Sequence, residues 1–319
     1  MKKRYIVLIT MVATLLLFTG CSGETKQGNI QKVGLLLEGK ITDQAWGEKG
    51  YKGLLNIKEK YEVDVEYKEE VITEEEIKET VEEFARDGVN LIFGHSSTYG
   101  KPFFELSNEY PDVHFVYFNG TYYNDNVTSL TFNSHAMGFF AGMLASEMST
   151  TNQVGIIAAY QWQPEIEGFY EGVKYQNPTT DVQMSFIYDW NEYQIALEMY
   201  EDMKEQNVDV FYPAGDAFSE QVIKRASEDG LYAIGFVSDQ YELDPNTVLT
   251  STVQRVDRLY SLTAEKFSKG DLEGEILTFD FKDDYISFGE FSPEVPEDFQ
   301  VTLNDAIEEY TETGFLPNQ

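Results

Sequence analysis

Short apolar runs alternate with longer amphipathic segments along most of the chain. Residues 33–37 and 90–94 are apolar runs typical of buried strands, whereas residues 46–61 carry apolar positions on one side, which predicts a helix. Thr73 is followed by Glu76 three places later, a capping box that predicts the start of the next helix. The first part of the chain therefore predicts a repeating strand–helix order.

The same alternation resumes after residue 135. Further strands are predicted at 63–67, 113–118, 153–159, 182–187, 208–212, 232–236 and 248–252, and further helices at 101–109, 136–148, 166–175, 192–206, 217–228, 256–268 and 297–313. Two blocks of βαβ repetition imply an α/β protein with two doubly wound parallel sheets. Because no segment has the composition of a linker, we expect two lobes joined by several chain crossings.

The N-terminus has the pattern of an export signal. Three basic residues precede an uncharged apolar run at 5–18, which is too short for a comfortable membrane span, and the run leads to Gly20 and Cys21. A small residue before a cysteine at this place resembles a bacterial lipobox, so we expect a signal peptide at 1–20, lipidation of Cys21 and a lipid-anchored tether at 21–31. The alternative is an uncleaved anchor with an idle thiol.

Composition excludes several classes of protein. The formal net charge of −33 repels phosphate backbones, which argues against direct nucleic-acid binding. One cysteine permits no intramolecular disulfide or thiolate cluster, and the three histidines lack metal-ligand spacing. Nucleophile-elbow, phosphate-loop and dinucleotide motifs are also absent from the sequence. We therefore expect no enzyme activity, no metal and no cofactor.

In sheets of this kind, ligands bind in the loops at the carboxyl ends of the strands. Here those loops are 38–46, 94–100, 119–125, 160–165, 213–217 and 237–243, and they combine small polar residues with aromatic ones. Aromatic faces beside a cleft suit a planar, uncharged or polar ligand. The candidate binding residues in or beside these loops are Asp43, Trp46, His95, Ser96, Phe118, Asn119, Trp162 and Asp216.

Each candidate also has a structural interpretation. An aromatic residue near a strand end more often belongs to a core or to the surface than stacks on a ligand. Trp46 and Trp162 are the stronger candidates, because both lie in polar loops where a core has no use for them. Asp43 is equally suited to capping the following helix, and a single histidine such as His95 is more often structural.

Several short segments match one known family. They include Thr42-Asp43-Gln44-Ala45-Trp46, Ser238-Asp239-Gln240 and Val248-Leu249-Thr250-Ser251. Together they resemble the basic-membrane-protein, or PnrA-like, family of substrate-binding lipoproteins over about residues 32–316. The resemblance implies the type I periplasmic-binding-protein fold, two Rossmann-like lobes with an interlobe cleft that usually serve an ABC importer. We expect one lobe at 32–133 plus 253–281 and the other at 134–252 plus 282–319.

The resemblance also assigns site residues. Asp43 matches an acidic ligand residue, Trp46 replaces a stacking phenylalanine, Phe169 falls near a second aromatic, and Gly215 matches a glycine that the ligand approaches.

Two positions depart from the nucleoside-binding members. Val237 stands where those members usually have an aspartate, and Gln254 stands where they usually have a lysine. In the family both groups address the ribose. Losing two charged hydrogen-bonding groups should cost several kcal/mol of affinity, at about 1.5–3 kcal/mol each. The departures therefore indicate a changed ligand, or a site retained for structure or signalling.

The segments Trp162-Gln163-Pro164-Glu165 and Tyr212-Pro213-Ala214-Gly215-Asp216 resemble a branch of the family described as regulators of competence gene expression. The sequence therefore predicts a membrane-anchored, extracytoplasmic lipoprotein that closes on a small ligand, either nucleoside-like or of unknown type, and acts in that regulation. The alternative is the substrate-binding component of a nucleoside ABC transporter, with an ABC permease as its partner.

Overall fold

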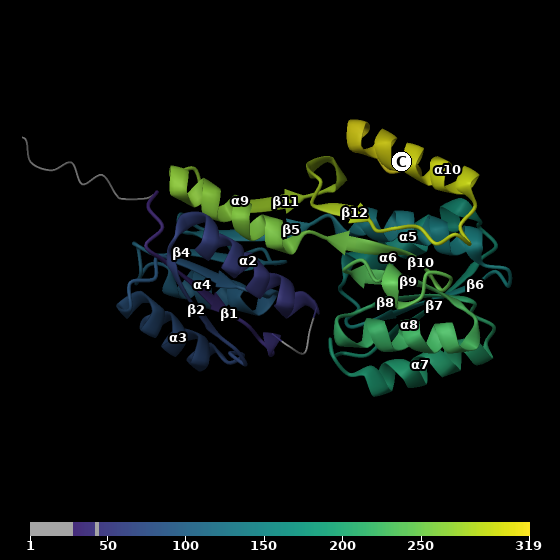
Figure 1. Cartoon of the computed structure of the whole chain (residues 1–319), viewed down its shortest axis with the longest axis horizontal. Coiled ribbons are helices and arrows are strands. Elements are labelled where there is room, and N and C mark those ends of the chain that lie inside the picture. The colour runs from purple at the N-terminus through teal and green to yellow at the C-terminus, as the bar shows by residue number, and fades with distance from the viewer. Residues whose placement is uncertain (1–27, 42–44) are drawn as a thin grey trace, which may run out of the picture.

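The computed structural model describes residues 28–41 and 45–319, which form two lobes side by side (Figure 1). The predicted signal peptide, Cys21 and Asp43 lie outside the described residues. The first lobe is built on a parallel six-stranded sheet of order β11-β5-β4-β3-β1-β2. Its strands are β1 (Lys32–Leu36), β2 (Asp64–Lys68), β3 (Leu91–Gly94), β4 (His114–Phe118), β5 (Val127–Phe132) and β11 (Ile276–Phe279).

Helices cover both faces of this sheet, as the apolar runs of its central strands require. One face packs against α2 (Ala45–Tyr61) and α9 (Val256–Lys269). The other face packs against α3 (Glu74–Arg86) and α4 (Gly100–Leu106), which follows the 3-10 turn η3 (Ser97–Tyr99). The predicted capping box of α3 is confirmed, because Glu76 N donates to Thr73 Oγ1 at 3.2 Å and Thr73 N donates to the Glu76 carboxylate at 2.9 Å.

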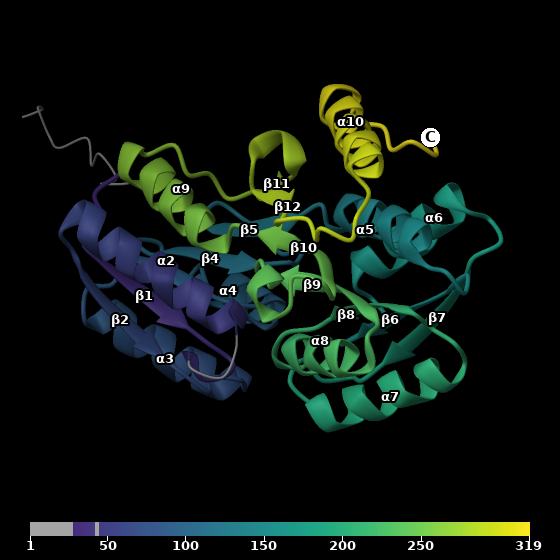
Figure 2. The same cartoon turned by 45° about the vertical axis from the view of Figure 1, so that its right-hand side comes forward.

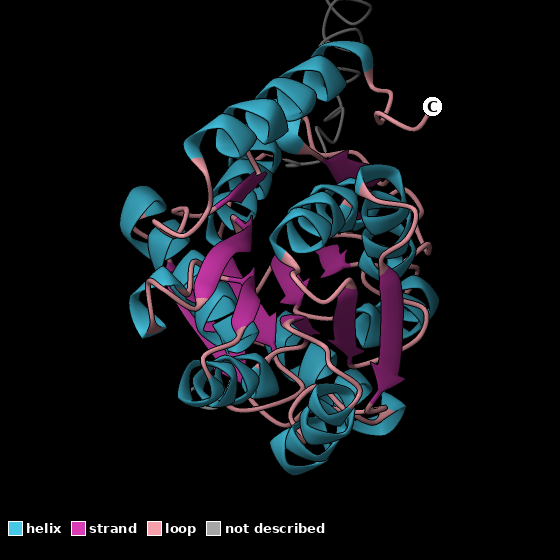
Figure 3. Cartoon of the chain, turned by 90° about the vertical axis from the view of Figure 1, so that its right-hand side faces the viewer, coloured by secondary structure: helices cyan, strands magenta, loops and turns pink. Residues whose placement is uncertain are grey.

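The second lobe repeats this plan with a six-stranded sheet of order β12-β10-β9-β8-β6-β7. Only the β10–β12 pair is antiparallel among the described strands of this sheet. In the two turned views the helices of this lobe surround its strands (Figures 2 and 3). The strands are β6 (Gln153–Ala158), β7 (Asp181–Phe186), β8 (Val210–Ala214), β9 (Tyr232–Val237), β10 (Val248–Gln254) and β12 (Ile286–Phe288).

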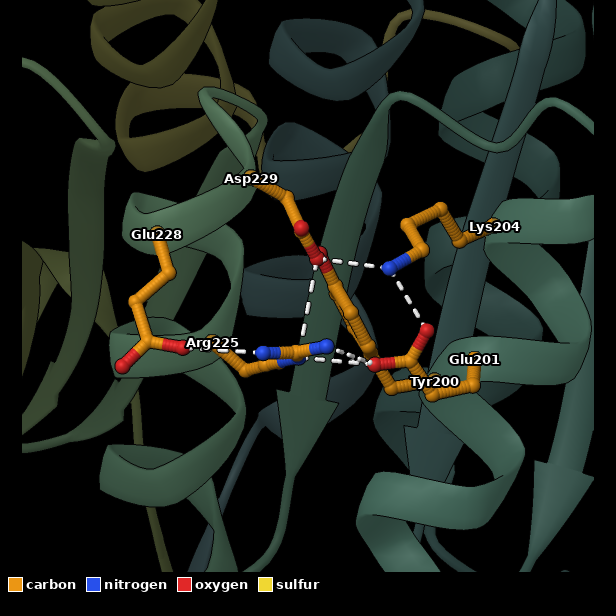
Figure 4. A network of polar contacts seen from close by, with 6 residues as sticks. All are labelled: Tyr200, Glu201, Lys204, Arg225, Glu228 and Asp229. Carbon is orange, nitrogen blue, oxygen red and sulfur yellow. Dashed lines mark hydrogen bonds and ion pairs between the residues drawn. The ribbon is translucent and has the colours of Figure 1, made fainter.

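One face of the second sheet packs against α5 (Ser134–Met148) and α6 (Pro164–Gln176), and the other against α7 (Tyr193–Glu205) and α8 (Ala217–Asp229). The C-terminal helix α10 (Glu297–Thr313) packs on the outer side of α5, where Tyr310 contacts Phe140 (Figure 1). A polar network joins α7 to α8 (Figure 4). In it Asp229 accepts from Tyr200 Oη at 2.9 Å and from Lys204 Nζ at 2.8 Å, while the Arg225 guanidinium binds Glu201 at 2.7 Å. The short 3-10 turns η4 (Tyr241–Leu243) and η5 (Phe281–Asp283) follow β9 and β11.

Within the described residues the chain passes between the two sheets three times, after β5, β10 and β11. Three strands were not predicted: β5, β11 and β12. The polar residues Thr128 and Ser129 interrupt the apolar pattern of β5, which is why the pattern did not predict this strand. Both residues are nevertheless fully buried: Thr128 Oγ1 donates to Glu273 O at 2.8 Å, and Ser129 Oγ donates to Gly120 O at 2.6 Å. The other two are short edge strands whose pairing depends on distant segments.

Candidate ligand-binding cleft

A cavity of about 750 Å³ lies at the carboxyl ends of the strands of both sheets. Its described walls come from the segments that end or follow β1, β3, β4 and β5 in the first lobe, and β6, β7, β8, β9 and β10 in the second. Small-molecule sites in proteins usually have volumes of about 300–1,000 Å³. The cavity is therefore large enough for a ligand the size of a nucleoside.

Most of the predicted site residues meet in this cavity. Those that line it are Trp46, His95, Ser96, Asn119, Trp162, Asp216, Val237 and Gln254. Three others are not among its lining residues: Phe118, Phe169 and Gly215. Phe169 is fully buried and stacks on Tyr212, with ring centroids 5.4 Å apart. At Gly215 an added Cβ would come within 1.9 Å of the Phe218 ring, so the packing of Phe218 accounts for this glycine.

Trp46 and His95 form one rigid unit in the wall of the first lobe. Their rings stack with centroids 4.7 Å apart, and Trp46 Nε1 donates to the His95 carbonyl at 3.0 Å. His95 Nε2 lies 2.7 Å from the Trp46 carbonyl, which can only accept, so Nε2 carries the proton and Nδ1 accepts from Tyr260 Oη at 2.9 Å. Burial lowers the pKa of His95 to about 4. This neutral histidine therefore positions Trp46.

The environment of Trp46 differs from the sequence-based interpretation. Its ring is only half-buried, yet it packs against the hydrophobic cores of both lobes. Phe118 lies beneath it at 5.6 Å in an edge-to-face arrangement. Trp46 therefore joins the two cores and also faces the cavity, whereas Phe118 supports it from behind.

Two side chains form hydrogen bonds across the cleft. The Asp216 carboxylate of the second lobe accepts from Trp46 N, in the first turn of α2, at 3.1 and 3.3 Å. From the same helix, Lys49 Nζ donates at 2.8 Å to the carbonyl oxygens of both Val237 and Gln254. Burial lowers the pKa of Lys49 to about 8. These contacts hold the lobes together in the arrangement seen here.

The two residues that depart from the family pattern both contact this bridge through their backbones. Val237 also has a φ of 63°, in the left-handed region. For a β-branched residue this conformation costs about 1–2 kcal/mol, and such strain clusters at ligand clamps and switch regions. Although this chain lacks the family's lysine at position 254, an ammonium group still contacts the backbone of positions 237 and 254. It belongs to Lys49, on the opposite lobe.

Several lining residues of the second lobe were not proposed as site residues. Asp189, Trp190 and Asn191 follow β7, and their position directly after a predicted strand was a usable signal. Gln163 and Glu165 follow Trp162; Gln163 Nε2 donates to Glu165 Oε1 at 2.7 Å. Glu165 is 4% exposed, and burial raises the pKa of its carboxyl. No sequence pattern distinguished this glutamate from the many on the surface.

Residues 30–319 match the family described as ABC transporter substrate-binding protein, PnrA-like. The chain belongs to this family. The resemblance and the predicted periplasmic-binding-protein fold with two lobes are thereby confirmed, since solute-binding proteins of ABC transporters share the fold. PnrA-like proteins are solute-binding proteins rather than enzymes, so this chain is a ligand-binding protein. Within its described ranges, no group of three or more His, Cys, Asp or Glu side chains is arranged to hold a metal.

Several individual relatives of this PnrA-like chain have informative names. It is 48% identical over 310 residues to transcriptional activator protein Med of Bacillus subtilis, covering 97% of this chain and 98% of that protein. It is 23% identical over 239 residues to a purine-binding protein of Brucella abortus, covering 74% of this chain and 67% of that protein. The crystal structure of a transcriptional activator of the comK gene from Bacillus halodurans matches with a TM-score of 0.82 and 44% identity, covering 90% of this chain and 99% of that one.

Proposed function

We propose that this protein is a membrane-anchored, extracytoplasmic lipoprotein that closes its lobes on a small ligand and acts in the regulation of competence gene expression. The observation that carries the proposal is the cavity between the lobes, bridged by Asp216 and Lys49. A ligand bound there stabilises the closed form, and the closed form is what a partner recognises. The likeness to Med supports the regulatory role.

The proposed anchor sets the route of regulation. The full chain has a net charge of −33, and removal of the basic residues in the proposed signal peptide makes the exported chain still more acidic. Such a chain does not act on DNA directly, so its effect on genes passes through another membrane component. Among the described residues, no helix is long and apolar enough to cross a bilayer. Lipidation of Cys21 after a signal peptide at 1–20 would supply the attachment. The proposed lobes, 32–133 plus 253–281 and 134–252 plus 282–319, are supported by the membership of the two sheets.

The second candidate function is the substrate-binding component of a nucleoside ABC transporter. The purine-binding relative in Brucella abortus favours it. Against it, the Val237 and Gln254 side chains that line the cavity carry no charge, so they cannot replace the ribose-binding aspartate and lysine of the nucleoside-binding members. We therefore favour the regulatory role.

Gene deletion tests the regulatory role. We expect loss of the gene to lower a competence-gene reporter, and expression of the intact chain to restore it. The Cys21→Ala variant should restore the reporter poorly, and the variant protein should no longer be found in the membrane fraction, because it lacks the residue that is acylated. An unchanged reporter in the deletion strain would contradict the regulatory proposal.

Thermal unfolding with added nucleosides tests the transport alternative. We expect inosine and guanosine at micromolar concentrations to leave the midpoint unchanged, since a ligand stabilises only the form that it binds. A rise of several degrees would instead support nucleoside transport.

A further inference from the structure

Three aromatic rings of the second lobe meet at one end of the cavity. Tyr160 and Trp162 stack with centroids 5.5 Å apart and an interplanar angle of 19°. Trp190 lies 5.5 Å from Tyr160 and 6.0 Å from Trp162, at 72° to the latter. All three line the cavity, and Trp162 is 56% exposed. We call these three residues the aromatic corner. Because the rings are oriented differently, one ligand can contact more than one of their faces.

Carboxyl groups from both lobes line the same cavity as the aromatic corner. Glu38 of the first lobe and Asp189 of the second both line the cavity. Burial, Asp189 and Glu38, in that order, raise the pKa of the Tyr160 phenol, so both carboxylates act electrostatically on this ring's hydroxyl. The buried Glu165 adds a third carboxyl to the same wall, and its burial raises its pKa and so favours the neutral form.

The cavity contains no opposite charge to balance these groups among its described lining residues. None of those residues is a lysine or an arginine. Lys49 is not among them, and its ammonium donates to the carbonyls of Val237 and Gln254. His95 is neutral because burial lowers its pKa to about 4. Asp216 is a further lining carboxylate, and it binds the start of α2. The field in the cavity is therefore negative.

A negative cavity with open aromatic faces selects a particular ligand chemistry. It repels phosphates and carboxylates, and a neutral nucleoside offers the carboxylates hydrogen bonds but no opposite charge. Aromatic faces attract cations through their quadrupole, most strongly when water is excluded, as in the recognition of quaternary ammonium groups. A methylated ammonium is weakly hydrated and has apolar surface, so it suits these rings better than a primary ammonium does.

We infer that the cleft binds a small organic cation of the methylated-ammonium type, with its charge held in the aromatic corner between Glu38 and Asp189. This inference rests on the proposed ligand-binding function and adds the class of ligand. It also gives a physical reason for the uncharged side chain at position 254, since a lysine there would repel this ligand.

The charge of the ligand can be tested with choline and its uncharged isostere, 3,3-dimethylbutan-1-ol. The purified full-length protein in a non-ionic detergent is suitable, because all three tryptophans of the chain line the cavity and report on it by fluorescence. We expect saturable binding of choline, and binding of the isostere weaker by at least about tenfold. Equal binding of the two compounds would overturn the inference.

Matched variants then locate the site. Asp189→Asn keeps an acceptor for Asn191 N, which Asp189 Oδ1 binds at 2.7 Å, but it removes the charge. It should weaken choline binding about tenfold or more, whereas Glu198→Gln, an exposed charge on α7 of the same lobe, should not. Equal effects of the two variants would show a general charge effect and overturn the inference.

The inference and the proposed function fail in different ways. If inosine or guanosine binds and choline does not, the cation inference is wrong while ligand binding in the cleft stands. If neither class binds, the cation inference is again overturned. The regulatory proposal falls only when gene deletion leaves the competence reporter unchanged.

Discussion

At the residue scale, two buried histidines are held neutral. Both nitrogens of His95 have partners, the Trp46 carbonyl and Tyr260 Oη. His114 Nε2 lies 2.7 Å from Thr128 Oγ1, while its Nδ1 is buried without a partner. Burial lowers the pKa of each ring to about 4. Folding therefore keeps protons off two groups that accept them readily in the unfolded chain.

This makes stability depend on pH in a defined window. Unfolded histidines titrate near 6.5, so between about pH 6.5 and pH 4 the unfolded chain binds more protons and stability falls as the pH falls. At about 1.4 kcal/mol per pKa unit, each ring accounts for about 3 kcal/mol of lost stability. The raised pKa of Glu165 acts in the opposite direction.

Urea unfolding over this pH range provides the measurement. His114→Gln removes one of the two histidines and should roughly halve their contribution to the pH dependence. The variant keeps a polar group for Thr128. An identical pH dependence in the variant and the unmodified protein would contradict the role of His114.

At the element scale, α5 and α6 approach so closely that their backbones touch through glycines. An added Cβ at Gly142 would lie 2.1 Å from Phe169 O, and one at Gly172 would lie 1.8 Å from Phe139 O. Backbone oxygens cannot rotate out of the way as a flexible side chain can. This close packing places the start of α6, with Glu165, at the cavity.

Gly172→Ala should therefore destabilise the protein although alanine favours helices. Forcing the helices apart costs about 1–3 kcal/mol or more, against a gain of about 1 kcal/mol in helix propensity. Chemical denaturation measures the difference, and Glu167→Ala on the exposed face of α6 is the control, with an expected change within about 0.5 kcal/mol. Equal stability of the two variants would show that the helices separate without cost.

At the scale of the whole molecule, the two lobes are joined at the start of α2. Its first turn donates to Asp216 of the second lobe, and one turn later Lys49 crosses the cleft in the same direction. The same helix carries Trp46, which packs against both cores. Opening of the lobes must break these contacts together.

Asp216→Ala should shift the protein towards an open form. A capping interaction is worth about 0.5–2 kcal/mol, so the ratio of closed to open molecules should fall by a factor of roughly 2 to 30. Small-angle scattering would show this as a larger radius of gyration without ligand.

Asp209→Ala is a matched control for this change. Asp209 also accepts from backbone N–H groups, those of Thr150 at 2.7 Å and Thr151 at 3.0 Å, but within the second lobe. We expect it to cost stability without changing the scattering curve. The same expansion in both variants would contradict a specific role for Asp216 in closure.

How well the sequence predicts a feature of this structure depends on how far apart in the chain the interacting residues lie. Hydrophobic period and helix caps are local, so the order of most strands and helices, and the capping box at Thr73, were predictable. The strand-end rule also located Trp46, His95, Trp162 and Asp216 in one cavity. Phe118, proposed on the same rule, and Phe169, proposed on the resemblance, are not among the lining residues, because which side of an element faces a core is decided by its neighbours.

The sequence by itself determined the α/β class, the two-lobe plan and the negative charge, since each depends on composition or on residues close together in the chain. Only the tertiary structure decided that Lys49 reaches Val237 and Gln254 across the cleft, and that Tyr160, Trp162 and Trp190 meet beside carboxylates from both lobes. These contacts join segments far apart in sequence. They exist only once two separately wound sheets are brought together by three chain crossings.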